Sequence, residues 1–197
     1  MDNIVTFLGA AFALTGSPGP NTLSIAAAGA AFGARRSLGY MVGLLAGMIV
    51  VMSAVAAGLT SLVLAIPNML QVLALLAVVY FLYLAWKIAT APPIGEETAA
   101  GRAPTFPGGV FLSLVNPKAY AAMGALFSGF TLAVADPATD AFFKIAVLTL
   151  VIAAVNLAWL SAGATLTRLF RDPLANRIVN IIFAALLLLS LLPALIR

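Results

Sequence analysis

Cysteine and histidine are both absent from this sequence of 197 residues. Their absence excludes disulfides, thiol nucleophiles, imidazole bases and the commonest zinc ligands. Among the remaining residues, no nucleophile stands beside a base and no group of metal ligands is found. The sequence therefore predicts no enzymatic activity, no metal site and no cofactor.

Charged residues are also scarce, at 8% of the sequence, whereas a soluble domain carries roughly 25%. Hydrophobic residues make up 63%, and the mean hydropathy is +1.14. A membrane-spanning helix needs about 20 apolar residues, so six spans with short loops use nearly the whole chain. We expect one all-α transmembrane domain over residues 1–197, in contact with membrane lipid. The net charge of +4 does not indicate nucleic-acid binding, because the basic residues are spread between apolar segments.

Six apolar segments are evident, at residues 3–34, 38–65, 67–90, 108–134, 141–167 and 174–196. Residues 91–107 are rich in Pro, Gly, Glu and Thr, which is typical of a solvated linker. The linker separates two halves, 1–90 and 108–197, with three predicted spans each. Two halves with three spans each enter the membrane in opposite directions, as inverted repeats do. Met1-Asp2-Asn3 lacks the basic start of a signal peptide, so the first segment is expected to stay as a span.

Lysine and arginine concentrate on one side of this predicted topology: Arg35, Arg36, Lys87, Arg102, Arg168, Arg171 and Arg177. The other side has Lys144 and Arg197, together with Asp2, Asp136 and Asp140. Short loops rich in Lys and Arg stay in the cytoplasm. We therefore expect a multi-pass protein of the bacterial inner membrane with both termini in the periplasm.

Polar, proline-containing segments interrupt the first and fourth spans near their middle, at residues 15–22 and 113–119. Pro18, Pro20 and Pro117 have no amide hydrogen, so the preceding turns lose backbone hydrogen bonds. Unpaired backbone inside a bilayer is tolerated only where neighbouring helices or a water-filled cavity satisfy it. A half-helix that begins after each break would direct free amides and a positive dipole end at an anion. The plainer alternative is that each proline only kinks its helix.

Lys118 is predicted to lie about ten residues, or roughly 15 Å, inside a slab of about 30 Å. Burying an unpaired ammonium there costs several kcal/mol, so Lys118 is expected to face a cavity. There it would offer a positive charge to a substrate carboxylate or phosphate. In the alternative reading, the fourth helix is shorter and Lys118 extends to the cytoplasmic surface. No Asp or Glu lies within a predicted span, which disfavours a cationic substrate. Asn156, in the fifth span, either faces the substrate or makes an interhelical hydrogen bond.

Glycines recur at every fourth position of the second span, at Gly39, Gly43 and Gly47. This spacing places small residues on one helix face and permits close backbone contact. With Gly29 and Gly33 it predicts packing between the first two spans, and a homodimer contact is the alternative.

Four features in this order and spacing resemble the lysine-exporter and homoserine/threonine-resistance (LysE/RhtB) family. They are Ser17-Pro-Gly-Pro-Asn-Thr-Leu23, the glycine-rich second span, Tyr83-Leu-Ala-Trp-Lys87 and Asn116-Pro-Lys118. The resemblance implies a six-helix bacterial inner-membrane exporter of amino acids, driven by the proton gradient. The family motifs fall on Pro18, Gly19, Pro20, Asn21 and Thr22, and on Asn116, Pro117 and Lys118. Members of the family often have an acidic residue in the fifth span, where this chain departs from the pattern with Asn156.

The leading hypothesis is a secondary exporter of neutral amino acids, with its site where the two halves meet. Half-helix amides after Pro20 and Pro117, with Lys118, would bind the substrate carboxylate. Asn21, Thr22, Asn116 and Asn156 would meet the amino group or side chain, and rocking of the halves would give alternating access. A cation channel or metal-ion carrier is the alternative, although it would need acidic pore residues. A non-transporting membrane scaffold would have no use for a buried lysine and two breaks.

Overall fold

The computed structural model describes residues 2–59, 66–90, 103–133, 136–169 and 173–189. Throughout these residues the regular secondary structure is helical. The helices are α1 (Asp2–Gly16), α2 (Pro20–Phe32), α3 (Ala34–Ala56), α5 (Met69–Ala89), α6 (Phe106–Val115), α7 (Pro117–Gly129), α8 (Pro137–Leu169) and α9 (Pro173–Leu189). The prediction of an all-helical fold is therefore confirmed for the described part of the chain.

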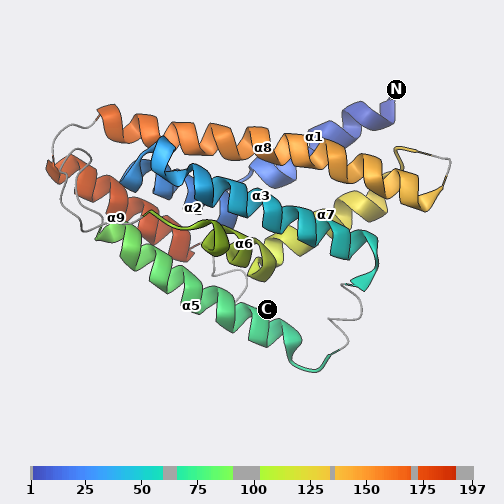
Figure 1. Ribbon diagram of the computed structural model, residues 1–197, viewed down its shortest axis with the longest axis horizontal. Coiled ribbons are helices and arrows are strands. Elements are labelled where there is room, and N and C mark those ends of the chain that lie inside the picture. The colour runs from blue at the N-terminus through green and yellow to red at the C-terminus, as the bar shows by residue number, and fades with distance from the viewer. Residues whose placement is uncertain (1, 60–65, 91–102, 134–135, 170–172, 190–197) are drawn as a thin grey trace.

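The helices run back and forth along the long axis of the molecule (Figure 1). The α2–α3 turn, the end of α5 and the start of α9 lie near one end, and the start of α1, the end of α7 and the start of α8 lie near the other. The α2–α3 turn is made by Gly33, whose φ of 79° is readily adopted only by glycine. The second span therefore begins at Ala34, four residues earlier than the predicted 38.

Both predicted interruptions are confirmed as helix ends. Residues 17–19 separate α1 from α2, and Asn116 separates α6 from α7, which are bent by 65° relative to each other. Among the described residues, the single helices long and apolar enough to cross a membrane are Ala34–Ala56 and Pro137–Leu166. The bent pair α6–α7 makes a third crossing if it is one span. The arrangement of six spans as two inverted halves, 1–90 and 108–197, stays a prediction.

Two apolar clusters fill the interior. The basic-end core, at the end of the molecule with Arg35 and Lys87, joins α2, the first half of α3, α5, α6, the second half of α8 and α9. Its large members are Leu23, Ile25, Phe32, Tyr40, Leu44, Phe81, Leu84, Ile88, Leu112, Val115, Leu160 and Leu187. The acidic-end core, at the end of the molecule with Asp136 and Asp140, joins α1, the second half of α3, α7 and α8. Its large members are Phe7, Met48, Val51, Met52, Met123, Leu126, Leu148, Val151, Ile152 and Val155. Ala11 and Leu23 belong to different cores, as do Val115 and Ala119, so each helix break lies between the two.

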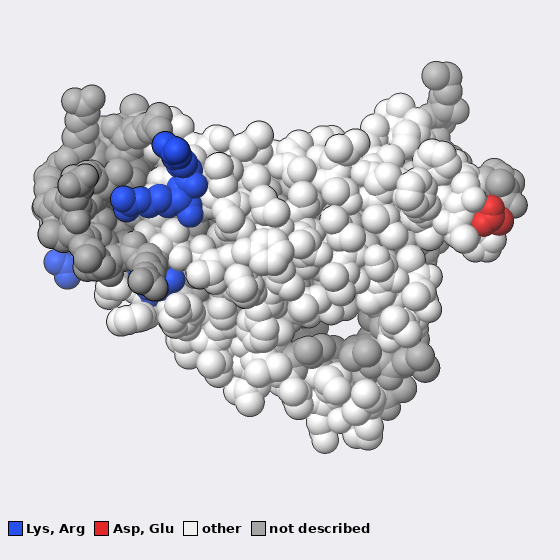
Figure 2. All heavy atoms as spheres, viewed as in Figure 1, with Lys and Arg blue, Asp and Glu red and all other residues white. Residues whose placement is uncertain are grey.

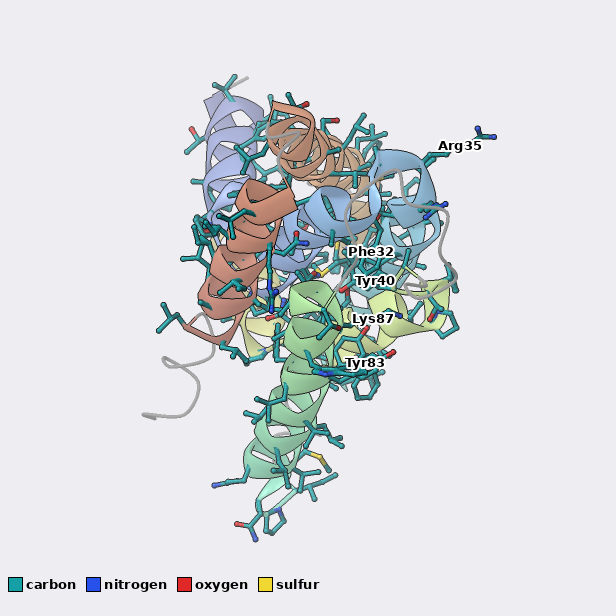
Figure 3. All side chains as sticks on the ribbon, turned by 90° about the vertical axis from the view of Figure 1, so that its left-hand side faces the viewer. Phe32, Arg35, Tyr40, Tyr83 and Lys87 are labelled. Carbon is teal, nitrogen blue, oxygen red and sulfur yellow. The ribbon has the colours of Figure 1, made fainter. Side chains whose placement is uncertain are left out.

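Charges mark the two ends of the molecule (Figure 2). Arg35 lies at the start of α3 and Lys87 near the end of α5, at the end of the molecule that faces the viewer in Figure 3. At the other end Asp136 accepts hydrogen bonds from the Thr139 hydroxyl and amide, which lower the pKa of its carboxyl and cap α8. Lys144, two turns into α8, is buried and pairs with Asp140 at 2.6 Å.

Two of the three glycines of α3, Gly43 and Gly47, pack closely against α6. A methyl group on Gly43 would overlap the Phe106 carbonyl, and one on Gly47 would lie 2.7 Å from Ser113 Cβ. Gly29 of α2 packs against Leu160 of α8 instead. The prediction that these glycines join the first two spans is therefore wrong: α2 and α3 are linked instead by hydrogen bonds of Ser37 and Tyr40, and Gly43 and Gly47 hold α6 close to α3.

Candidate functional site

The end of α1 is held by the side chain of Lys118. Its Nζ donates hydrogen bonds to the Ser17 carbonyl at 2.7 Å, to the Ser17 hydroxyl at 2.8 Å and to the Pro18 carbonyl at 3.1 Å. A cation at a helix C-terminus is favoured by the negative end of the helix dipole. Lys118 therefore lies across the break of the other half of the chain, partly buried, and does not extend to the end of the molecule.

Gly19 makes room for that lysine. A Cβ atom on Gly19 would lie 2.8 Å from Lys118 Cδ and 2.9 Å from Lys118 Nζ. The φ of Gly19 is −179°, an extended conformation open to any residue, so the need for glycine comes from the close approach alone.

The carbonyls that Pro18 and Pro20 release, each four residues before its proline, find donors as well. The Leu14 carbonyl accepts from the Ser17 hydroxyl at 3.1 Å, and the Gly16 carbonyl accepts from Trp159 Nε1 at 3.1 Å. Trp159 lies on α8, three residues after Asn156 and thus on the same helix face. Sequence reasoning missed Trp159, although an indole N–H inside an apolar span needs a partner and was the available signal.

A chain of amide and hydroxyl groups connects the two breaks. Asn116 Nδ2 donates to Asn21 Oδ1 at 3.0 Å, Asn21 Nδ2 donates to Ser113 Oγ at 3.0 Å, and Ser113 Oγ donates to the Leu44 carbonyl at 2.9 Å. Asn116 Oδ1 also accepts from the Lys118 amide at 3.1 Å and so caps α7. This network holds α2, α3 and the α6–α7 junction together.

Thr22 completes the start of α2. Its hydroxyl accepts a hydrogen bond from the Gly19 amide at 2.9 Å. Pro20, at the first helical position, has no amide hydrogen that would need an acceptor. In this structure the polar atoms of Asn21, Thr22 and Asn116 are therefore engaged with the protein itself.

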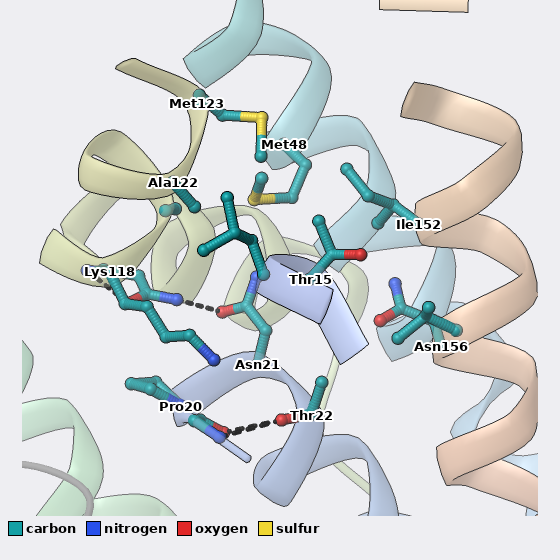
Figure 4. Close-up of a pocket in the computed structure, with 15 residues that line it drawn as sticks. Thr15, Pro20, Asn21, Thr22, Met48, Lys118, Ala122, Met123, Ile152 and Asn156 are labelled. Atoms are coloured by element: carbon teal, nitrogen blue, oxygen red, sulfur yellow. Dashed lines mark hydrogen bonds between the residues drawn. The ribbon is translucent and has the colours of Figure 1, made fainter. Parts of the chain in front are cut away.

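A cavity of about 40 Å³ lies between the two breaks and the acidic-end core (Figure 4). It is lined by Leu14, Thr15, Gly19, Pro20, Asn21, Thr22, Met48, Asn116, Lys118, Ala119, Ala122, Met123, Ile152, Val155 and Asn156. Of the predicted site residues, only Pro18 and Pro117 are not among them. Since a water needs about 10–15 Å³ of such space, the cavity has room for a few water molecules.

Asn156 reaches this cavity from α8 and is only 2% exposed. Its Nδ2 makes no hydrogen bond in the described part of the protein. The predicted alternative, in which Asn156 makes a plain interhelical bond, therefore has no support from this atom. An unpaired buried amide group costs free energy unless a ligand or water satisfies it.

Known proteins resemble this chain along most of its length. The model of the LysE type translocator family matches residues 12–191. The cysteine/O-acetylserine efflux protein of Salmonella typhimurium (strain LT2) is 33% identical over 175 residues, covering 87% of this chain and 86% of that protein. The protein of the same name from Escherichia coli (strain K12) is 30% identical over 175 residues, with the same coverage. No solved structure matches the chain.

Proposed function

Because this chain belongs to the LysE-type translocator family, we propose that it is a secondary transporter that exports small neutral amino acids across a bacterial inner membrane. The matched relatives are named for efflux of cysteine and O-acetylserine, two small amino acids without a charged side chain. Family membership supports the transport of amino acids, and the substrate class and the site are argued from the residues below.

The observation that carries the proposed site is the position of Lys118. Its ammonium group lines the cavity at the junction of two broken helices, where it is bonded to three oxygens of the α1–α2 break. A substrate carboxylate can replace some of these oxygens and gain a charge-assisted hydrogen bond. The N-terminal ends of α2 and α7, at Pro20 and Pro117, add favourable dipoles for the same anion.

The remaining lining favours an uncharged side chain. None of the residues around the cavity is acidic, so a lysine-like or arginine-like substrate would find no counter-ion there. The cavity instead has an apolar wall, which is made by Met48, Met123, Ile152 and Val155. A small neutral amino acid matches the chemistry of both parts of the lining, with its carboxylate at Lys118 and its uncharged side chain at the apolar wall.

The transport cycle that we propose depends on the two apolar cores, which lie on opposite sides of the helix breaks. The cavity in this structure is too small for an amino acid, so entry and release each require one core to open. In our proposal the broken pairs α1–α2 and α6–α7 count as one span each, giving six spans in two inverted halves that rock against each other. The end with Arg35, Arg36, Lys87 and Arg177 is the cytoplasmic one, which places both termini in the periplasm.

Counterflow in proteoliposomes tests this proposal. Vesicles that contain the purified protein and an unlabelled amino acid are diluted into trace labelled amino acids from a panel of neutral, basic and acidic members. We expect accumulation of labelled small neutral amino acids and none of the basic ones. Ion flux without any amino-acid exchange would support the cation channel or ion carrier instead.

A further inference from the structure

The polar side chains around the cavity differ in whether they already have hydrogen-bond partners within the protein. In the described structure, protein partners are present for the polar groups of Thr15, Asn21, Thr22, Asn116 and Lys118. The Nδ2 group of Asn156 has no such partner. The amide of Asn156 is thus a buried donor group that lacks an acceptor.

The surroundings of Asn156 restrict which acceptor can reach it. Ile152 and Val155 lie on the same helix, and Met48 and Met123 complete the apolar wall from α3 and α7. In Figure 4 Asn156 extends from α8 toward Thr15, and Lys118 lies on the opposite side of Asn21. A substrate whose carboxylate is at Lys118 would therefore direct its side chain toward Asn156.

We infer that Asn156 selects the substrate by donating a hydrogen bond from Nδ2 to an uncharged oxygen acceptor in the side chain of the exported amino acid. The acceptor is a hydroxyl or ester carbonyl oxygen. A thiol sulfur is a weak acceptor and an aliphatic side chain offers none. This inference rests on the proposed function and assigns to the same site the chemical class of its substrate.

The reason for selection is that an aliphatic side chain leaves the buried amide group unpaired when it fills the cavity. A second carboxylate would accept a hydrogen bond, but it would be buried against an apolar wall with no second cation among the lining residues. Sites that hydrogen-bond a substrate group discriminate strongly against analogues that lack it. For one neutral hydrogen bond we expect a preference of about tenfold.

The test compares O-acetylserine with homoleucine, in which the ester is replaced by a hydrocarbon of nearly the same shape. The ratio of their kcat/KM values in counterflow is measured for the unchanged protein and for Asn156→Leu, which keeps the side-chain shape and removes the donor. We expect a ratio of about ten to fall to about one. Asn156→Ala, which removes the whole amide group, should lose the preference as well and keeps the test open if the first variant does not fold.

Asn180→Leu is the matched control. Asn180 is also an asparagine that is 2% exposed and has an unpaired side-chain atom, Oδ1, in the described structure, but it does not line the cavity. This variant should keep the ratio of the unchanged protein. A ratio near one in the unchanged protein, or a preference that survives in both Asn156 variants, overturns the inference while amino-acid exchange still stands. Absence of exchange with every amino acid would refute the proposed function itself.

Discussion

Asn21 and Asn116 are 95 positions apart in the chain, yet the amide group of Asn116 donates a 3.0 Å hydrogen bond to Asn21 Oδ1. Asn21 follows Pro20 at the start of α2, and Asn116 precedes Pro117 at the start of α7. The same kind of residue therefore stands beside the break in each half. Their contact links the two interrupted helices directly, beside the hydrogen bonds of Lys118 to Ser17 and Pro18.

This link predicts energetic coupling between the two asparagines. We expect Asn21→Ala and Asn116→Ala each to destabilise the protein, and the double variant to lose less than the sum, because the second change removes a bond already broken. Measured interhelical hydrogen bonds in membranes suggest a coupling energy of roughly 0.6–1.7 kcal/mol. Reversible unfolding in mixed micelles measures it. Additive effects of the two substitutions would show that the observed bond has no energetic role.

Lys118 is predicted to be essential for transport. Lys118→Ala should reduce amino-acid counterflow by at least about a hundredfold, since the substrate carboxylate loses a buried, charge-assisted partner worth roughly 3 kcal/mol. The amount of protein in the membrane should stay near normal. Lys87→Ala is the matched control, because Lys87 lies at the basic end outside the cavity. Normal counterflow by Lys118→Ala would remove this residue from the site.

Gly19 gives a test of the geometry around Lys118. Gly19→Ala would place a methyl group 2.8 Å from Lys118 Cδ, so the lysine side chain must move. Because that side chain is flexible and φ at Gly19 is open to alanine, we expect a folded protein with transport reduced about tenfold or more, the loss that a displaced charged hydrogen bond of about 1.4 kcal/mol gives.

Gly16→Ala is its control at the other side of the same break. The nearest atom that a methyl group there would meet is Val155 Cγ2, at an ordinary contact distance of 3.9 Å. Transport by this variant should be close to normal. Equal loss in both variants would mean that the break tolerates no added methyl group and that Lys118 is not the reason.

The glycine face of α3 predicts a contrast in stability. A methyl group on Gly43 would overlap the Phe106 backbone of α6, which cannot move without separating the helices. Gly43→Ala should therefore cost about 1–3 kcal/mol, as overpacking of a close contact does. Gly39 has nothing within 4 Å of such a methyl group, so Gly39→Ala should be neutral or slightly stabilising. Thermal unfolding in detergent compares the two, and equal midpoints would contradict the packing of α3 on α6.

The positions of the breaks followed from the sequence because proline acts locally. Pro18, Pro20 and Pro117 remove backbone hydrogen bonds wherever the chain folds, so both helix ends were predictable. That Lys118 would have polar partners was also predictable, since a lysine so far inside an apolar segment needs groups that satisfy its ammonium.

The partners of these groups were not predictable, because they come from distant segments. Nothing near Asn21 indicates that its amide group bonds to Ser113, 92 positions away. Asn21, Thr22 and Asn116 were therefore expected to face the substrate, whereas here they bond to the protein. In the same way the glycine spacing of α3 predicted close packing but not that α6 would be the partner.

Substrate protection of an engineered cysteine tests most directly whether the junction of the broken helices is the substrate site. The natural chain has no cysteine, so Ala122→Cys in the cavity wall is the sole thiol, and Ala138→Cys on the exposed start of α8 is its control. During turnover in proteoliposomes, a small neutral amino acid that the protein exchanges should slow maleimide labelling of Ala122→Cys several-fold and leave Ala138→Cys unchanged. If a saturating concentration of that amino acid leaves labelling of Ala122→Cys as fast as before, the substrate does not bind between Pro20 and Pro117.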